Sequence, residues 1–160
     1  MVEPQSKLTV LVNTLKKRGH RITPQRMAIL RIFTESEEHP SVEQVYERIR
    51  PDYPMTSLAT VYKTVVLLKE EGEILELGFA NGRSRYDAKK PYPHPHLICV
   101  RCQRILDPEI GTLETLPLEL SRKYGYQIVS HRLDIYGICP ECQAIEPKEG
   151  GRPSDEMNPR

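Results

Sequence analysis

Residues 87–107 read DAKKPYPHPHLICVRCQRILD, and this stretch contains candidate ligands for two different kinds of metal site. Cys99 and Cys102 form a C-x-x-C pair, and the other two cysteines of the chain, Cys139 and Cys142, form a second pair. Four thiolates in two such pairs favour a tetrahedral zinc ion that holds a fold together. We therefore expect a structural Zn²⁺ bound by all four cysteines.

The same stretch supplies nitrogen and oxygen ligands for a second site. His94 and His96 are separated by a single residue, and Asp87 and Asp107 lie on either side of them. Imidazole combined with carboxylate suits iron, manganese or zinc, and is less selective than thiolate. The spacing therefore predicts an exchangeable metal at these four residues, in addition to the structural zinc.

The composition is that of a folded protein without a membrane partner. The chain has 160 residues, of which 38% are hydrophobic and 28% are charged, which is enough for one ordinary domain or two small ones. No apolar run approaches the roughly 20 residues of a membrane span, and the N-terminus shows no secretory signal. Paired cysteines without such a signal indicate metal binding in a reducing cytoplasm, with disulfide bonds as the alternative. We expect a cytoplasmic protein.

Positive charge is concentrated near the N-terminus, although the net charge is only +1. No acidic residue occurs between Pro4 and Thr34, and the basic residues in this interval are Lys7, Lys16, Lys17, Arg18, Arg21, Arg26 and Arg31. A charge run is often only a solvated helix face. A run this one-sided in a near-neutral chain favours a surface that faces phosphates.

Helical periodicity and capping residues predict four helices in the first half of the chain. The first runs from about Leu8 to the residue before Gly19, and the second from Pro24 to about Glu35. The third begins at a capping box at residues 41–44, and the fourth runs from Thr56 or Ser57 to Gly72. The fourth helix is expected to bury Leu58, Val61, Val65 and Leu68. The period then changes to two at residues 74–77 and 83–86, which predicts a β-hairpin around Asn81-Gly82. Helices followed by a hairpin predict a winged helix-turn-helix domain over residues 1–88.

A proline-stiffened hinge at residues 89–95 leads into a predicted second domain over residues 89–145. Its expected elements are short strands at residues 96–99 and 105–106, a helix from Leu113 to Tyr124 with Pro117 in its first turn, and a strand from Tyr126 to Ile138. Residues 146–160 are polar and rich in Gly and Pro, so we expect them to be disordered. The predicted fold class is α+β, a winged helix followed by a small α/β domain with a four-cysteine zinc site.

The fourth predicted helix has a polar face suited to DNA. Thr56, Ala59, Thr60 and Lys63 recur at helical spacing opposite the buried stripe, and Tyr62 lies at the edge of this face. Thr and Ala can contact thymine methyl groups, and Lys can reach guanine or phosphate. Taken alone, this pattern fits an ordinary solvent-exposed helix as well as it fits a DNA-reading helix. Together with the wing and the acid-free N-terminal surface, it favours DNA binding.

These features resemble the Fur (ferric uptake regulator) family of bacterial metal-dependent repressors. The matching motifs lie within about residues 10–143, and they are His39-Pro40, Ala59-Thr-Val-Tyr62, Ser84-Arg-Tyr-Asp87, His94-Pro-His-Leu-Ile-Cys99, Cys102 and Tyr136-Gly-Ile-Cys139. The resemblance implies an N-terminal winged helix, a C-terminal dimerisation domain, a homodimer, and an A/T-rich inverted-repeat operator in double-stranded DNA.

The resemblance also assigns DNA contacts. By position, Arg21 is similar to the family's basic residue that enters the minor groove, and Tyr62 is similar to its base-contacting tyrosine. Family members often have arginine after that tyrosine, where this chain has Lys63. An ammonium group does not grip guanine bidentately in a plane as guanidinium does, so the operator preference is left open.

The resemblance adds His39 to the second metal site. It implies that His39, Asp87, His94, His96 and Asp107 bind a regulatory Fe²⁺ or Mn²⁺, with ligands from both domains. Such an ion would fix the angle between the domains, and so place the recognition helices of a dimer in successive major grooves. Loss of the ion would free the hinge and lower the affinity for the operator.

Two departures from the iron-type pattern resemble the peroxide-regulator (PerR) branch of the family. Pro93 and Pro95 stand where iron-type members often have His and Asp, so we expect the additional metal site built there to be absent. Glu114 and His131, which resemble the other ligands of that site, are nevertheless present. The second departure is that both carboxylate ligands of the regulatory site are aspartates, where iron-type repressors tend to have glutamate.

In the peroxide-regulator branch, ferrous iron reacts with hydrogen peroxide, and the oxidant adds oxygen to a ligand histidine. By position, the oxidised histidines would be His39 and His94. This damage would release DNA, whereas the manganese form would be insensitive to peroxide. We therefore predict a repressor whose signal is hydrogen peroxide. A repressor of iron, zinc or manganese uptake, which senses metal level alone, is the main alternative.

Two more distant alternatives use the same residues. A non-haem iron oxygenase or a metallohydrolase also binds its metal with two histidines and a carboxylate. No substrate-pocket signature accompanies the winged helix, so we expect no enzyme and no catalytic residue. A haem sensor is conceivable because Cys139-Pro140 resembles a thiolate haem motif, but the zinc site would already use Cys139.

Overall fold

The computed structural model describes residues 6–79, 82–111 and 115–145, so the predicted disorder of residues 146–160 lies outside the described residues. The chain divides into two compact units, Met1–Tyr92 and Pro93–Arg160. The first unit contains a two-stranded sheet and the second a three-stranded one. None of the helices in the described ranges is both long and apolar enough to cross a membrane.

The described part of the first unit contains four helices, α1 (Lys7–Lys17), α2 (Pro24–Glu35), α3 (Val42–Ile49) and α4 (Leu58–Glu70). Each follows a Ser or Thr whose side-chain oxygen accepts a hydrogen bond from the backbone N–H three residues later. Such caps satisfy donors that a helix start leaves open. At α3 the cap is reciprocal, because Gln44 Oε1 also accepts from the Ser41 N–H at 2.9 Å. The predicted capping box is confirmed.

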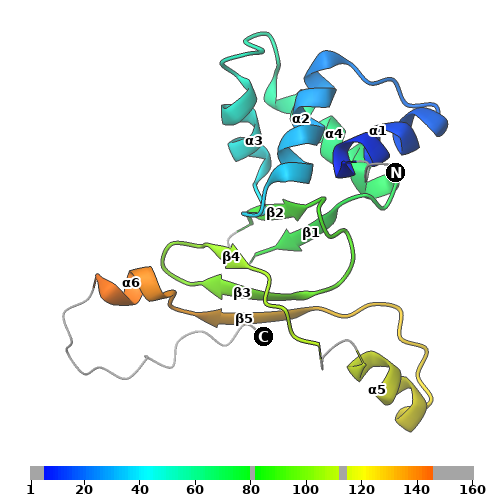
Figure 1. The fold of residues 1–160 in the computed structure, drawn as a ribbon, viewed down its shortest axis with the longest axis vertical. Helices are drawn as coiled ribbons and strands as arrows, with labels where there is room; N and C mark the ends of the chain where they lie inside the picture. The colour runs from blue at the N-terminus through cyan, green and yellow to red at the C-terminus, as the bar shows by residue number, and fades with distance from the viewer. Residues whose placement is uncertain (1–5, 80–81, 112–114, 146–160) are drawn as a thin grey trace, which may run out of the picture. The chain divides into compact units, whose positions relative to one another are not determined.

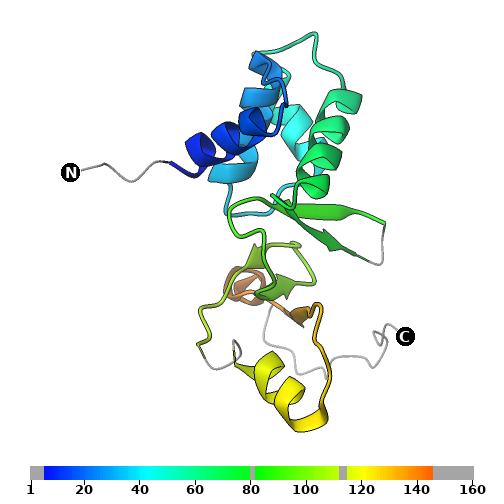
Figure 2. The same cartoon turned by 90° about the vertical axis from the view of Figure 1, so that its right-hand side faces the viewer.

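Strands β1 (Leu75–Gly78) and β2 (Ser84–Asp87) pair antiparallel, which confirms the predicted hairpin. Figures 1 and 2 both show the four helices gathered on one side of this hairpin. Phe33 of α2 and Tyr86 of β2 meet edge to face, with ring centroids 6.1 Å apart. Aromatic pairs favour this arrangement. The contact attaches the hairpin to the helical core and completes a winged helix.

The second unit contains β3 (Pro95–Cys99), β4 (Ile105–Leu106), α5 (Leu116–Tyr124), β5 (Leu133–Gly137) and α6 (Pro140–Ala144). The strand order is β4-β3-β5, with β3 antiparallel to β4 and parallel to β5. Helix α6 follows the C-terminal end of β5 (Figure 1). Pro117 lies in the first turn of α5, as predicted. Leu113, the predicted first residue of that helix, lies outside the described residues.

The predicted strand from Tyr126 to Ile138 is wrong in its first half, because β5 begins at Leu133. Leu133 pairs with Pro95, the first residue of β3. The residues before Pro95 include two further prolines, which have no backbone N–H to donate to a neighbouring strand. Because the two strands are parallel, the ladder begins where β3 begins, so residues 126–132 lie outside any strand of the described chain.

Few apolar side chains are buried in the described part of the second unit. Among its described residues, the buried apolar ones are Ile98, Cys99 and Ile105. Large apolar side chains are exposed on α5 and on the segment that follows it, among them Leu116, Leu118, Leu120, Tyr124, Tyr126 and Val129. A core this small contributes little stability by itself. The unit therefore needs another source of stability, such as a metal ion.

Candidate metal sites and nucleic-acid interface

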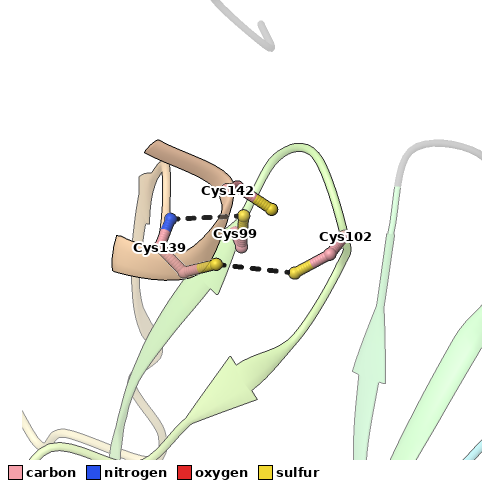
Figure 3. Close-up of side chains that lie close together, drawn as sticks. All are labelled: Cys99, Cys102, Cys139 and Cys142. Atoms are coloured by element: carbon pink, nitrogen blue, oxygen red, sulfur yellow. Dashed lines mark hydrogen bonds between the residues drawn. The ribbon is translucent and has the colours of Figure 1, made fainter. Parts of the chain in front are cut away.

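The structure brings the four cysteines together. Cys99 ends β3 and Cys102 lies in the turn before β4, whereas Cys139 precedes α6 and Cys142 lies within it (Figure 3). Their sulfur atoms lie within 4.8 Å of one another, and the Sγ atoms of Cys102 and Cys139 are 3.7 Å apart. The parallel pairing of β3 with β5 places the two C-x-x-C pairs at the same end of the sheet.

The donor chemistry of this cluster fits zinc. The Cys139 N–H donates a hydrogen bond to Sγ of Cys99 at 3.4 Å, and this bond lowers the pKa of the Cys99 thiol to about 6. A hydrogen bond with Cys139 raises the pKa of the Cys142 thiol to about 12. Sulfur atoms this close cannot all carry negative charge unless a cation lies among them. A zinc ion that replaces the thiol protons meets this condition.

Three predicted ligands of the second metal converge within the second unit. The Nε2 atoms of His94 and His96 are 3.1 Å apart, and Nε2 of His94 lies 3.1 Å from Oδ2 of Asp107. Nε2 of His96 lies 3.8 Å from Oδ1 of the same carboxylate. Two imidazole nitrogens and one carboxylate directed at a common point form a donor set for iron, manganese or zinc.

His96 is held by a residue that the spacing analysis missed. Its Nδ1 atom lies 3.2 Å from Oδ1 of Asp134, and the two residues are direct partners in the β3–β5 ladder. Arg132 Nε donates to the other carboxylate oxygen, Oδ2, at 2.6 Å. The sequence feature that could have pointed to Asp134 is an acidic residue within the otherwise apolar strand sequence LDIYG. Local residue spacing does not reveal a parallel pairing between two strands so far apart in the sequence.

Two further predicted ligands, His39 and Asp87, lie together in the first unit. Nε2 of His39 is 3.3 Å from Oδ2 of Asp87, and Nδ1 of His39 is 3.2 Å from the carbonyl oxygen of Glu37. Oδ1 of Asp87 accepts from the Lys89 and Lys90 N–H groups at 2.7 and 2.9 Å, which leaves Oδ2 directed at the imidazole. Burial raises the pKa of Asp87, but the interaction with His39 and the hydrogen bonds from the Lys90 and Lys89 N–H groups outweigh it and lower the pKa below its ordinary value.

The loop that carries His39 is held in an uncommon backbone conformation. The φ angle of His39 is 52°, in the left-handed region that residues with a Cβ seldom adopt. The Arg85 side chain donates to the carbonyl oxygens of His39 and Glu38. The Tyr86 N–H donates to the carbonyl oxygen of Pro40 at 3.1 Å. These bonds fix the loop against β2 and offset a strain of about 1–3 kcal/mol.

Helix α4 exposes most of the predicted DNA-reading face. Ala59, Tyr62 and Lys63 are exposed and Thr60 is half-buried. The expectation that Thr56 shares this face is wrong, because it is only 6% exposed. The helix is capped by Ser57, so Thr56 lies outside the helical period and turns inward.

The buried face of α4 also differs from the prediction in one residue. Leu58, expected in the core, is 37% exposed. Val61, Val65 and Leu68 are buried as predicted, together with Thr64. Leu58 is the first residue of the helix, where the end of the element leaves it with fewer neighbours than the residues one turn later.

Tyr62 is tied to the neighbouring helix. Its Oη donates to Oε1 of Glu43, in the first turn of α3, at 3.2 Å. The hydrogen bond to the Glu43 backbone N–H lowers the pKa of that carboxyl group, and the negative carboxylate raises the pKa of Tyr62. Because the Tyr62 hydroxyl donates its hydrogen bond to Glu43, the oxygen lone pair is left to face DNA. This lone pair can accept a hydrogen bond from the amino group of a base.

The acid-free N-terminal segment is only partly available to phosphates. Arg21 is exposed in the loop between α1 and α2. Arg18 instead contacts the end of α4, with Nη1 2.6 Å from Oε2 of Glu71, whose other oxygen lies 2.7 Å from Nε2 of His20. Hydrogen bonds from His20 and Arg18 lower the pKa of Glu71. This cluster joins the ends of α1 and α4.

A sequence profile described as the ferric uptake regulator family matches residues 17–136, well over half of the chain. The chain belongs to the Fur family. The peroxide-responsive repressor PerR of Staphylococcus aureus (strain USA300) is 36% identical to this Fur-family chain over 135 residues, which cover 82% of the chain and 88% of the relative.

Two solved structures have similar folds. The Helicobacter pylori ferric uptake regulator Fur superimposes with a TM-score of 0.73 and 30% identity, covering 90% of this chain and 95% of that one. A zinc-bound manganese uptake regulator superimposes with a TM-score of 0.66 and 36% identity, covering 81% and 98%. This chain is therefore a PerR-like, metal-dependent repressor of the Fur family.

Both metal assignments agree with this family membership. The four cysteines form a cluster that can hold a structural zinc ion, and the cluster of histidine and aspartate side chains fits a regulatory metal. Of the residues that resemble a third site, Glu114 lies outside the described residues. His131 is exposed, and no cluster of metal-binding side chains among the described residues includes it.

Proposed function

We propose that this repressor senses hydrogen peroxide through a regulatory Fe²⁺ or Mn²⁺ bound by His39, Asp87, His94, His96 and Asp107. The observation that carries the proposal is the convergence of the His94 and His96 Nε2 atoms with the Asp107 carboxylate. This donor set contains no thiolate, so it is distinct in chemistry from the zinc cluster and suits an exchangeable ion. The similarity to a peroxide-responsive repressor supports the same assignment.

The proposed ligands belong to both units of the chain, which gives the metal a way to control DNA binding. An ion that takes His39 and Asp87 from the first unit and the other ligands from the second restricts the motion of one unit against the other. In a homodimer, that restriction places two α4 helices in successive major grooves of an A/T-rich inverted repeat. The hinge between the two units is then restricted when the metal is bound and free when it is lost, and this couples metal binding to operator binding.

The proposed signal is a covalent change in a ligand. When bound, ferrous iron would donate electrons to hydrogen peroxide, a reaction that manganese supports poorly. In the overall reaction, one peroxide oxygen is added to a ring carbon of His39 or His94 and the other leaves as water. The imidazole loses two electrons and the peroxide gains them. An oxidised ring is a weaker ligand, so the metal is released and the operator affinity falls.

The proposed DNA contacts are Arg21, Ala59, Thr60, Tyr62 and Lys63. Arg21 is assigned to the minor groove by its resemblance to the family pattern, and the other four to the major groove. Exposure of Ala59, Tyr62 and Lys63 on one helix supports this assignment. Thr56 is not among the proposed contacts because it is buried.

The proposal is tested by loading the zinc-containing protein with either Fe²⁺ or Mn²⁺ and exposing each form briefly to hydrogen peroxide. Binding to an operator-type duplex and to a scrambled duplex is measured before and after exposure by fluorescence anisotropy. Peptide mass spectrometry then locates added oxygen, with the His20 peptide as an internal control. We expect the iron form alone to lose operator binding and to gain oxygen on His39 or His94, while His20 remains unmodified.

A repressor that senses metal level alone is the second candidate, favoured by the similarity to the Fur and manganese uptake regulator structures. In this case the iron and manganese forms would both keep operator binding after peroxide treatment, and no histidine would gain oxygen. If neither loaded form bound the operator-type duplex more tightly than the scrambled one, the assignment of α4 as the DNA-reading helix would be wrong.

A further inference from the structure

We propose that Asp134 is a positioning residue for the regulatory metal, because it fixes the proton of the His96 ring on Nδ1 and leaves the lone pair on Nε2. This role rests on the proposed function, in which His96 is a metal ligand. Asp134 itself is not proposed to touch the metal. It acts through the ring that it holds.

The geometry of the pair carries this proposal. His96 and Asp134 face each other across the parallel β3–β5 ladder, with Nδ1 and Oδ1 3.2 Å apart. Their side chains are 1% and 10% exposed, so little water competes for this hydrogen bond. A carboxylate accepts and does not donate, so Nδ1 must carry the proton. Nε2, on the opposite side of the ring, then faces His94 and Asp107 with its lone pair.

Arg132 fixes the carboxylate in turn. Its Nε and Nη2 atoms lie 2.6 and 2.5 Å from Oδ2 of Asp134, the oxygen that does not face His96. A guanidinium ion holds a carboxylate oxygen through strong charge-assisted hydrogen bonds. The two oxygens of Asp134 therefore have separate partners, and the carboxylate cannot rotate without losing one of them. The chain Arg132–Asp134–His96 resembles the carboxylate–histidine pairs that orient metal ligands in proteins generally.

The comparison with His39 shows what a carboxylate adds. Nδ1 of His39 lies 3.2 Å from the carbonyl oxygen of Glu37, so the acceptor on this side of the ring carries no formal charge. A charged acceptor makes the opposite ring nitrogen a stronger donor to a metal than a neutral acceptor does. Of these two proposed ligands, we therefore expect His96 to hold the metal more firmly. His39 is the more easily released of the two.

The experiment compares the zinc-containing protein with four variants, which are Asp134→Ala, Asp134→Asn, His96→Ala and, as a control, Glu119→Ala. The control removes the same charge from α5, away from the ring. Two quantities are measured: the tautomer of His96, from long-range ¹⁵N–¹H NMR correlations in protein without regulatory metal, and the Kd for Mn²⁺, from the electron paramagnetic resonance signal of the free ion. Zinc content is determined for every variant to verify that the second unit is intact.

We expect the Nδ1–H tautomer in the wild-type protein and in Asp134→Asn, because the amide oxygen still accepts the hydrogen bond. Asp134→Ala should give a mixture of tautomers and raise the Kd for Mn²⁺ about 10- to 100-fold. The Asp134→Asn variant should show a smaller loss of affinity, and Glu119→Ala should match the wild type.

Two results would overturn the proposal in different ways. If His96→Ala weakens Mn²⁺ binding but Asp134→Ala changes neither the tautomer nor the Kd, Asp134 has no positioning role and the proposed ligand set stands. If His96→Ala leaves Mn²⁺ binding unchanged, His96 is not a ligand, and the proposed function fails together with the role of Asp134.

Discussion

The Tyr86 N–H donates to the carbonyl oxygen of Pro40 at 3.1 Å, and this bond joins the chain neighbours of two proposed ligands. Pro40 follows His39, and Tyr86 precedes Asp87. The distance between the two ligand residues is therefore set by the backbone rather than by side-chain torsions alone. A ligand pair arranged before the metal arrives loses less conformational freedom when it binds.

Arg85 is expected to be the side chain on which this arrangement depends most. Arg85→Ala removes the donors to the His39 and Glu38 carbonyl groups, so the left-handed conformation of His39 loses its support. We expect the free energy of unfolding to fall by about 1–3 kcal/mol and the Kd for Mn²⁺ to rise about tenfold. Urea denaturation and metal titration measure the two effects. Arg83→Ala, which removes the same charge just before β2, should leave both quantities near the wild-type values.

Removal of one zinc ligand should unfold the second unit. Cys142→Ser replaces a thiolate by a hydroxyl, a poor zinc ligand, in a unit with few buried apolar residues. We expect the zinc content to fall from about one ion per chain to near zero, with loss of the circular dichroism signal of the β3–β5 sheet. Elemental analysis and spectroscopy test this, with Ala144→Ser in the same helix as the control. A Cys142→Ser protein that retained both zinc and spectrum would contradict the assignment of this cysteine.

Glu43 should influence how Tyr62 reads DNA. Glu43→Gln removes a negative charge near the phosphates and frees the Tyr62 hydroxyl to act as donor or acceptor. We therefore expect tighter binding to scrambled duplex and a smaller preference for the operator. Tyr62→Phe should lose about 1–3 kcal/mol of operator binding without gaining affinity for scrambled DNA. Anisotropy titrations at fixed salt compare these variants. If Glu43→Gln kept the full preference, the hydrogen bond to Tyr62 would have no part in recognition.

The contact between α1 and α4 should depend on pH through Glu71. Its folded-state pKa is lowered, first by the hydrogen bond from His20 and then by Arg18. The contribution to stability is therefore complete above the ordinary pKa of glutamate, and is lost as the pH falls through the lowered value. Glu71→Gln should lower the urea midpoint at neutral pH, and the difference from the wild type should vanish in acid. Glu70→Gln, one residue earlier in α4, is the control at each pH. A difference that persisted unchanged in acid would contradict this assignment.

Local chemistry made the first unit predictable. Its helix starts are determined by residues within four positions, such as the Thr23 cap followed by Pro24 and the reciprocal Ser41 and Gln44 pair. The errors occur at the start of α4, where Thr56 is buried and Leu58 is exposed. A shift of one or two residues in the start of a helix reverses the side on which its first residues lie.

The second unit was harder to predict because its organisation depends on pairing between distant strands. The cysteine and histidine ligands were identified because their short spacing is typical of metal sites. Asp134 was not identified, since only the register of β3 with β5 places it opposite His96. The length of β5 was overestimated for the same reason, because the apolar pattern from residue 126 onward does not reveal where the neighbouring strand begins.

The separation of the two cysteine pairs has a consequence for chains still being synthesised. A nascent chain leaves the ribosome N-terminus first, and every residue of the first unit's buried core precedes Lys89. Cys139 follows Cys102 by 37 positions, so the parallel strand β5 and half of the thiolates are made only after β3, β4 and α5. The zinc ion therefore completes the second unit late. In a cell short of zinc, newly made chains would carry a finished DNA-reading helix attached to an open unit, whose exposed apolar residues chaperones and proteases can recognise.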